Sequence, residues 1–307
     1  MQTPAFSFTT LPPLVVAQYL PNLSDLNLFV GDLKDLNPTI YAFEYELATP
    51  LFTDYAHKQR IIALPPGEKM LFVDDGFPDF PDNTVLAKTF SYNYDESDAS
   101  LGKIIIETRV LIKINGEWKL GNYVWNQDQS DAVLSTETVT LPISYIDVDG
   151  STKDIDYVIP SSTDCFTCHS NAGNEVPIGP KLRTLNFNDQ LQDFIDNNYI
   201  EGLLDATLVS SLPVWNDTSF SREERARAYF DVNCAHCHSV GGYCEEQSTL
   251  RLLYETPFND SNIYNQRFNI LVRMQENIPE FSMPWIGTTI VHNEGFDLIQ
   301  SYLNSLD

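Results

Sequence analysis

One stretch decides the fold: Lys103-Ile-Ile-Ile-Glu-Thr-Arg-Val-Leu-Ile-Lys-Ile-Asn-Gly-Glu-Trp-Lys-Leu-Gly-Asn-Tyr-Val-Trp125. Two runs rich in β-branched and aromatic residues, which favour strands, flank the dipeptide Asn115-Gly116. Asn-Gly between two such runs is a strong signal for a two-residue hairpin turn, because both central residues of that turn need a positive φ. The stretch therefore predicts two antiparallel strands over Lys103–Ile114 and Glu117–Trp125.

Further strand-like runs lie on both sides of this hairpin, separated by Gly, Pro and Asn or Asp turns. They are Thr84–Tyr92, Thr138–Val148 and Ile155–Ile159. Asp149-Gly150 supplies a second turn signal between the last two runs. We therefore expect residues 60–160 to form an antiparallel sheet or sandwich. Residues 1–60 are rich in Pro and Leu, and we expect one short helix there, around Leu23–Asp35.

The pattern changes from strand-like to helical near residue 160. Ser221-Arg-Glu-Glu224 has the form of a capping box, whose side chains satisfy the first backbone N–H groups of a helix. It predicts a helix over Arg222–Asn233. A closing amphipathic helix is expected over Asn293–Leu306, where apolar residues recur at helical spacing. One or two further helices are expected within Phe187–Ser210.

Two copies of one five-residue pattern lie in this second part: Cys165-Phe-Thr-Cys168-His169 and Cys234-Ala-His-Cys237-His238. Cys-x-x-Cys-His is the attachment sequence of c-type haem. Two thiols three positions apart on a helical turn can form thioethers with the two vinyl groups of one porphyrin, and the imidazole that follows then lies under the iron. The motifs therefore predict two covalent haems, with Cys165, Cys168, Cys234 and Cys237 as attachment sites and with His169 and His238 as iron ligands.

Other chemistry is open to the same cysteines. A Cys-x-x-Cys pair can be redox-active, and two pairs could supply four zinc thiolates. However, a zinc site does not require a His directly after each pair, and a redox motif of the thioredoxin type belongs to a βαβ pattern that this sequence lacks. Haem attachment is the favoured interpretation. The fifth cysteine, Cys244, is then expected to be a free thiol.

The fold class predicted from these patterns is α+β, with an antiparallel β-rich domain followed by a mainly helical dihaem cytochrome c region. We expect a β-rich domain with an irregular N-terminal segment over residues 1–160. A first haem-binding segment is expected over 161–218 and a second haem domain of cytochrome c type over 219–307. The middle segment is short for a complete haem pocket, so we expect a neighbouring domain to cover the first haem.

The second haem has a clear candidate for its sixth ligand. Met283 lies in Ser282-Met-Pro-Trp285, in a loop just before the closing helix, and Pro284 stiffens that loop. His/Met coordination would favour reduced iron and raise the potential. The alternative is that the Met283 side chain only fills a gap in the core.

The first haem has no comparably clear sixth ligand. Met70 and His57 are the candidates from the β-rich region, and an iron without a sixth ligand is the third alternative. Met274 and His292 are expected to have core or surface roles in the second haem domain. His236, inside the second motif, is expected to point away from the iron and lie on the surface.

Composition limits the partners. The 307-residue chain has 18 Lys and Arg against 43 Asp and Glu, a net charge of −25. Such a surface repels nucleic acid and anionic lipid, and it suits a redox partner with a basic docking face, although general solubility would also explain it. The sequence contains no run of about 18 apolar residues, so it predicts no transmembrane segment. The residues that follow Met1 do not have the pattern of a secretory signal. Because covalent haem attachment nevertheless implies export, we expect a mature form whose targeting segment has been removed.

The sequence also resembles a family of bacterial dihaem c-type cytochromes with an N-terminal β-rich region. The similarity covers most of the chain, including Thr49-Pro-Leu-Phe-Thr-Asp-Tyr55, Phe80-Pro-Asp-Asn-Thr-Val-Leu-Ala-Lys-Thr-Phe90, Ile106-Glu-Thr-Arg109, Tyr123-Val-Trp-Asn126, Ile178-Gly-Pro-Lys181, the run from Glu224 to His238, and Met283-Pro284. The resemblance implies two haems and an exported electron-transfer role. After the second motif, where relatives often carry a Pro-Gly turn, this chain has Ser239-Val-Gly-Gly-Tyr-Cys244.

Together these features predict a periplasmic or cell-surface dihaem cytochrome that passes single electrons between partner proteins. An electron carrier is favoured over a catalyst, and no catalytic residue is assigned. The alternative is a dihaem peroxidase-like oxidoreductase, in which the first haem keeps an open or displaceable distal site. A non-catalytic sensor or assembly factor is a third interpretation.

Overall fold

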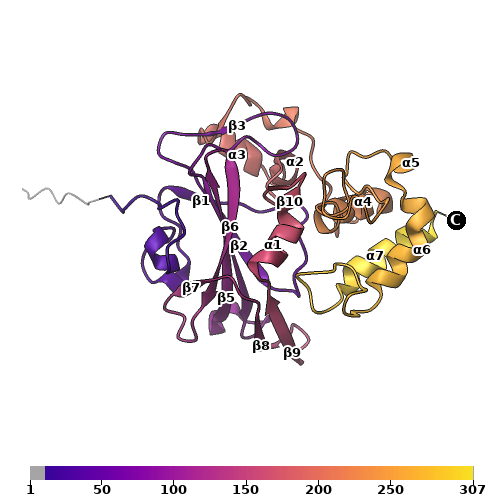
Figure 1. Ribbon diagram of the computed structural model, residues 1–307, viewed down its shortest axis with the longest axis horizontal. Coiled ribbons are helices and arrows are strands. Elements are labelled where there is room, and N and C mark those ends of the chain that lie inside the picture. Colours follow the sequence, from indigo (N-terminus) through magenta and orange to yellow (C-terminus); the bar gives the residue numbers. More distant parts are fainter. Residues whose placement is uncertain (1–10, 307) are drawn as a thin grey trace, which may run out of the picture.

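The computed structural model describes residues 11–306 (Figure 1). The expectation of a removed targeting segment concerns the first residues of the chain, which lie outside this range. Figure 1 shows a twisted sheet at one side of the molecule and a group of helices at the other, with the short helix α1 (Ser162–His169) between them.

The largest element is a six-stranded antiparallel sheet, with spatial order β1-β2-β4-β5-β6-β7. Its strands are β1 (Ala42–Glu44), β2 (His57–Ala63), β4 (Val85–Asn93), β5 (Lys103–Ile114), β6 (Glu117–Trp125) and β7 (Ala132–Ser135). The hairpin predicted from the sequence is confirmed, since Ile114 pairs with Glu117. Asn115 and Gly116 form the turn between them, with φ angles of 53° and 83°.

The remaining strands form two-stranded units. β8 (Val139–Ile146) pairs with β9 (Thr152–Ile159) as a separate antiparallel hairpin around the second turn signal. β3 (Met70–Leu71) pairs in parallel with β12 (Ile200–Glu201), and β10 (Ser170–Asn171) pairs with β11 (Asn174–Glu175). The antiparallel pairing expected over residues 60–160 is confirmed except at the two-residue strand β3, which pairs in parallel.

Apolar side chains cover both faces of the large sheet. One face packs against the N-terminal segment, whose Leu23, Leu26, Leu28 and Leu36 are buried against it. The single helix expected over Leu23–Asp35 is wrong: the segment forms two short 3-10 turns, η1 (Leu23–Leu26) and η2 (Leu33–Asp35). The reason is local, because Asn27 takes a left-handed φ of 55° directly after η1 and ends it.

The opposite face of the sheet supports short helices. These are α2 (Leu182–Leu185) and α3 (Gln190–Asp196), which pack their leucines and Phe194 on residues from β2, β4, β5 and β6. The 3-10 turn η3 (Ala99–Leu101) lies before β5, and η4 (Ala206–Leu208) follows β12. This face also carries α1, so the β-rich region covers the first Cys-x-x-Cys-His motif.

The C-terminal helices are α4 (Arg222–Asn233), α5 (Phe258–Ser261), α6 (Ile263–Met274) and α7 (Asn293–Asn304). α4 begins where the sequence predicted it, with the backbone N–H of Glu224 donating to Ser221 Oγ and the backbone N–H of Ser221 donating to the Glu224 carboxylate. The closing helix is also confirmed to within two residues. α6 was not predicted.

The predicted fold class needs a correction. The region after residue 160 is not mainly helical, because fewer than half of residues 161–306 lie in helices. The structure is instead β-rich, and the six-stranded antiparallel sheet dominates it. The local signals predicted individual helices correctly, but they did not show how much irregular chain separates those helices. Long irregular segments, 234–257 and 275–292, stand between the helices instead.

Candidate functional site

Helix α1 presents the first motif. A capping box starts the helix: the backbone N–H of Asp164 donates to Ser161 Oγ at 3.2 Å, and the backbone N–H of Ser161 donates to the Asp164 carboxylate at 3.0 Å. Capping satisfies backbone donors that would otherwise lack partners, so this short helix begins at a fixed residue. Cys168 and His169 therefore lie about one helical turn after Cys165, all on the same short helix α1.

His169 has the environment of a metal-ligating imidazole. It is buried, and its Nδ1 lies 2.8 Å from the carbonyl oxygen of Val176. A carbonyl oxygen can only accept, so Nδ1 carries the proton and Nε2 keeps a free lone pair. Burial, followed by the charge of Lys88, lowers the pKa of His169 to about 3, so the ring is neutral. Neutral imidazole with an oriented Nε2 is the form that binds iron.

The second motif follows α4 directly. The backbone N–H of Cys234 donates to the Phe230 carbonyl at 2.9 Å, and the N–H of His238 donates to the Cys234 carbonyl at 2.9 Å. These bonds continue the helical turn through the motif. Burial lowers the pKa of His238 to about 4, and its Nδ1 is buried without a hydrogen-bond partner within residues 11–306.

A cavity of about 490 Å³ opens at this second motif. Its walls include Cys234, Cys237, His238 and Met283. The rest of the lining is largely apolar and comes from α4, α6 and nearby loops, including Tyr229, Phe230, Leu250, Leu252, Ile270, Met274 and Trp285. This volume is typical of a cofactor pocket, and the donors are those that a c-type haem requires. The residues at the second motif therefore fit a haem, with His238 and Met283 in one cavity.

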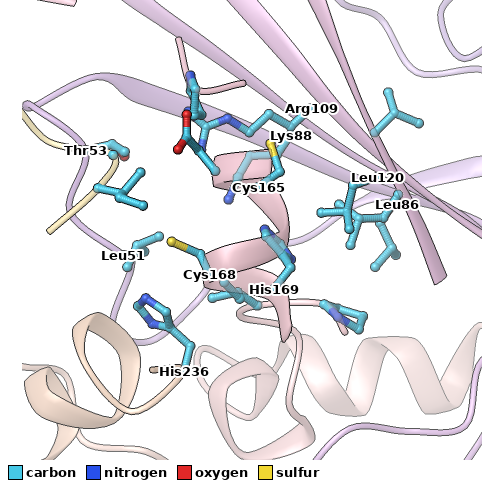
Figure 2. A pocket seen from close by; sticks show the side chains of 18 of the residues that line it. Leu51, Thr53, Leu86, Lys88, Arg109, Leu120, Cys165, Cys168, His169 and His236 are labelled. Carbon is cyan, nitrogen blue, oxygen red and sulfur yellow. The ribbon is translucent and has the colours of Figure 1, made fainter. Parts of the chain in front are cut away.

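The cavity at the first motif is smaller, about 70 Å³. Figure 2 shows Lys88 and Arg109 beside Cys165, and His236 beside Cys168. Leu86 and Leu120, from the large sheet, line it as well. The donor set of Cys165, Cys168 and His169 fits a c-type haem. The volume admits a porphyrin only if lining side chains move.

The two candidates for the first haem's sixth ligand do not line this cavity. Met70 is fully buried in the apolar cluster that also contains Ile200 and Phe194. His57 lies on β2 with half of its side chain exposed, and its Nε2 is 2.8 Å from the Glu96 carboxylate. The structure therefore brings neither residue to His169.

His236 is not the surface bystander that the sequence suggested. It lines both cavities, and one of its ring nitrogens lies within 4.8 Å of the thiol sulfurs of Cys168 and Cys237. Cys244 is a free thiol, as expected, and it lines the second cavity. The two motifs, far apart in the sequence, thus meet. Sequence reasoning missed this because no local pattern reports a contact between distant loops.

A row of cations on the large sheet was also missed. Arg60, Lys88 and Arg109 lie directly opposite one another across β2, β4 and β5. Arg60 pairs with Glu46 at 2.9 Å, and Arg109 pairs with the fully buried Glu107. Burial, followed by the charges of Arg109 and Arg60, lowers the pKa of Lys88 to about 7. In a chain of net charge −25, this cluster beside the first motif is an exceptional positive site.

Two residues discussed in the sequence analysis remain, His292 and Met274. His292 is stacked on Phe52, with ring centroids 4.2 Å apart, and its Nδ1 is 2.9 Å from the hydroxyl of Tyr229. Met274 lies at the end of α6 and lines the second cavity. Neither lines the first cavity.

Among the helices of residues 11–306, none combines the length and apolar character needed to span a lipid bilayer. In comparisons with known proteins, no family model, no curated protein and no solved structure matches this chain.

Proposed function

We propose that this protein is a dihaem c-type cytochrome that transfers single electrons between redox partner proteins. One observation carries the proposal: His238 and Met283 line the same cavity as Cys234 and Cys237. Two thiols, an imidazole and a thioether around one apolar cavity form the complete donor set of a His/Met c-type haem. The His169 geometry, with Nδ1 at the Val176 carbonyl, supports a second haem at the other motif.

The haems supply the one-electron chemistry, and the chain holds them and sets their surroundings. Cys165, Cys168, Cys234 and Cys237 would form the covalent attachments. The backbone carbonyl of Val176 orients His169, and His238 and Met283 would supply the nitrogen and sulfur ligands of the second haem. Since Cys168 and Cys237 lie within 4.8 Å of each other, the two attachment sites are adjacent. This proximity supports electron exchange between the two haems.

The proposal extends to the family and the location. We place the chain with the bacterial dihaem cytochromes that it resembles, acting in the periplasm or at the cell surface, where c-type haem is attached. Its net charge of −25 favours a partner with a basic docking face.

A second candidate function is a dihaem peroxidase-like oxidoreductase. It is favoured by the lining of the first cavity, which includes neither Met70 nor His57. A first haem without a sixth ligand would bind peroxide or another small molecule. Spectra of the ferric protein with and without cyanide separate the two functions, since two six-coordinate irons that resist cyanide indicate a carrier.

The test of electron transfer is a redox titration of protein matured in a host that attaches c-type haem. We expect two one-electron centres, and the second should lose its methionine-ligated spectrum when Met283 is replaced by Ala. A protein with haem but no electron exchange with any soluble redox mediator would refute the carrier function.

A further inference from the structure

Two thiols and one imidazole gather where the two motifs meet. The sulfurs of Cys168 and Cys237 and a ring nitrogen of His236 all lie within 4.8 Å of one another. Cys168 comes from α1, whereas His236 and Cys237 follow α4. Cys244 also lines the cavity that contains Cys168, His236 and Cys237.

The loop after the second motif returns to the backbone of Cys237. The backbone N–H of Cys244 donates to the Cys237 carbonyl at 3.1 Å. Gly242 makes this return possible, since a Cβ atom at that position would lie 2.5 Å from the same carbonyl oxygen. The chain therefore approaches the motif so closely that only glycine fits there.

An unpartnered polar atom points to a ligand. His236 Nδ1 is buried and has no hydrogen-bond partner within residues 11–306. A buried ring nitrogen without a partner costs free energy that a bound ion would recover.

We propose that the haem-free chain binds one soft divalent metal ion, such as Zn²⁺, through Cys168, His236 and Cys237. Two sulfurs and one imidazole nitrogen supply three of the four ligands of a tetrahedral zinc site, a water molecule completes it, and binding releases the thiol protons to solvent. The site goes beyond the proposed electron-transfer function. Cys168 and Cys237 cannot hold both a metal and haem thioethers, so the ion binds before haem attachment, joins the two motifs and must leave for attachment to proceed.

The test uses the full chain produced without haem attachment, kept reduced and titrated with Co²⁺ as the zinc probe. We expect one equivalent to bind, with the intense absorption of thiolate-to-cobalt charge transfer, and Zn²⁺ to displace it and raise the unfolding temperature. Loss even of an outer-shell partner costs about 10- to 100-fold in metal affinity, so H236A should cost at least about tenfold. The matched controls C165S and C234S remove the other thiol of each motif and should leave the affinity unchanged.

Two results would overturn the proposal. One is a wild-type chain that binds no Co²⁺. The other is binding of two equivalents that C165S and C234S weaken as much as H236A does, because each Cys-x-x-Cys pair would then act alone. H236N serves if H236A does not fold, and it should weaken binding to a similar extent. The haem-loaded protein should bind no Co²⁺ at this site, and undiminished binding there would also refute the assignment. Haem content is measured separately, so failure of the metal site and failure of the cytochrome function are distinguishable.

Discussion

The carboxylate of Asp54 accepts hydrogen bonds from the backbone N–H of Thr289 at 2.9 Å, across 235 residues of sequence. The backbone N–H of Ile290 donates to the same carboxylate at 3.2 Å. Asp54 is almost fully buried, and burial raises its pKa while the Thr289 hydrogen bonds oppose that rise. This contact fixes the segment that follows Met283 to the β-rich region. The position of the Met283 sulfur, which we propose as an iron ligand, thus depends on Asp54 in the β-rich region.

Replacing Asp54 by Ala should therefore loosen the Met283 loop. Two backbone donors would lose their partner, which costs about 1–3 kcal/mol for each buried group. We expect a lower free energy of unfolding in urea titration and partial loss of the methionine-ligated spectrum at the second haem. Asp128→Ala, which removes a fully exposed carboxylate bonded only to its own turn, is the control. Equal stability of the two variants would contradict the role given to Asp54.

Met283 should be distinguishable from its neighbour Met274, since both line the second cavity. M283A should convert one ferric haem to a high-spin or water-ligated form and lower its potential, because a thioether ligand favours reduced iron. M274A should leave the ligation unchanged. Optical and magnetic resonance spectra of the ferric variants give the answer, and the reverse pattern would assign the ligand to Met274.

Lys88 should raise the potential of the first haem. A cation near the iron stabilises the reduced state, and a partly buried charge at close range contributes about 1 kcal/mol or more to that stabilisation. We expect K88Q to lower one of the two potentials, measured at pH 6 where the amine is protonated, since its pKa is about 7. K88R should keep the wild-type value, and K153Q, which removes an exposed lysine on β9, should change neither potential. A change of spin state in K88R would instead make Lys88 an iron ligand.

His292 should make the stability of the protein depend on pH. Burial lowers its folded-state pKa from 6.5 to about 4, so the unfolded chain binds a proton at a higher pH than the folded chain does. The free energy of unfolding should therefore fall as the pH drops from 6.5 to 4, by up to about 3 kcal/mol from this group. H292F keeps a ring against Phe52 but cannot be protonated. Between pH 6.5 and pH 4 the unfolding temperature of the haem-loaded wild type should therefore fall further than that of haem-loaded H292F, and parallel curves for the two proteins would contradict this.

The sequence predicted local structure well where local chemistry decides it. The β5–β6 hairpin follows from Asn115-Gly116, and the start of α4 follows from the Ser221–Glu224 capping box. Both signals lie within a few residues of the structure that they specify. The helix expected over Leu23–Asp35 failed because the left-handed turn at Asn27 was not recognised.

Contacts between distant segments could not be predicted in this way. Met70 seemed available as an iron ligand, but β3 pairs with β12 and buries it in another cluster. His236 seemed to lie on the surface, yet the segment that follows α4 meets α1 and brings it to Cys168. A single sequence carries no local signature of such pairings, because they depend on how all the elements pack together.

The most direct measurement is the intact mass of the chain after expression in a host that attaches c-type haem, followed by mapping of the modified peptides. We expect the polypeptide mass plus two haems, one on the peptide with Cys165 and Cys168 and one on the peptide with Cys234 and Cys237. A chain with the mass of the bare polypeptide, with all five thiols unmodified, would contradict the proposed cytochrome function.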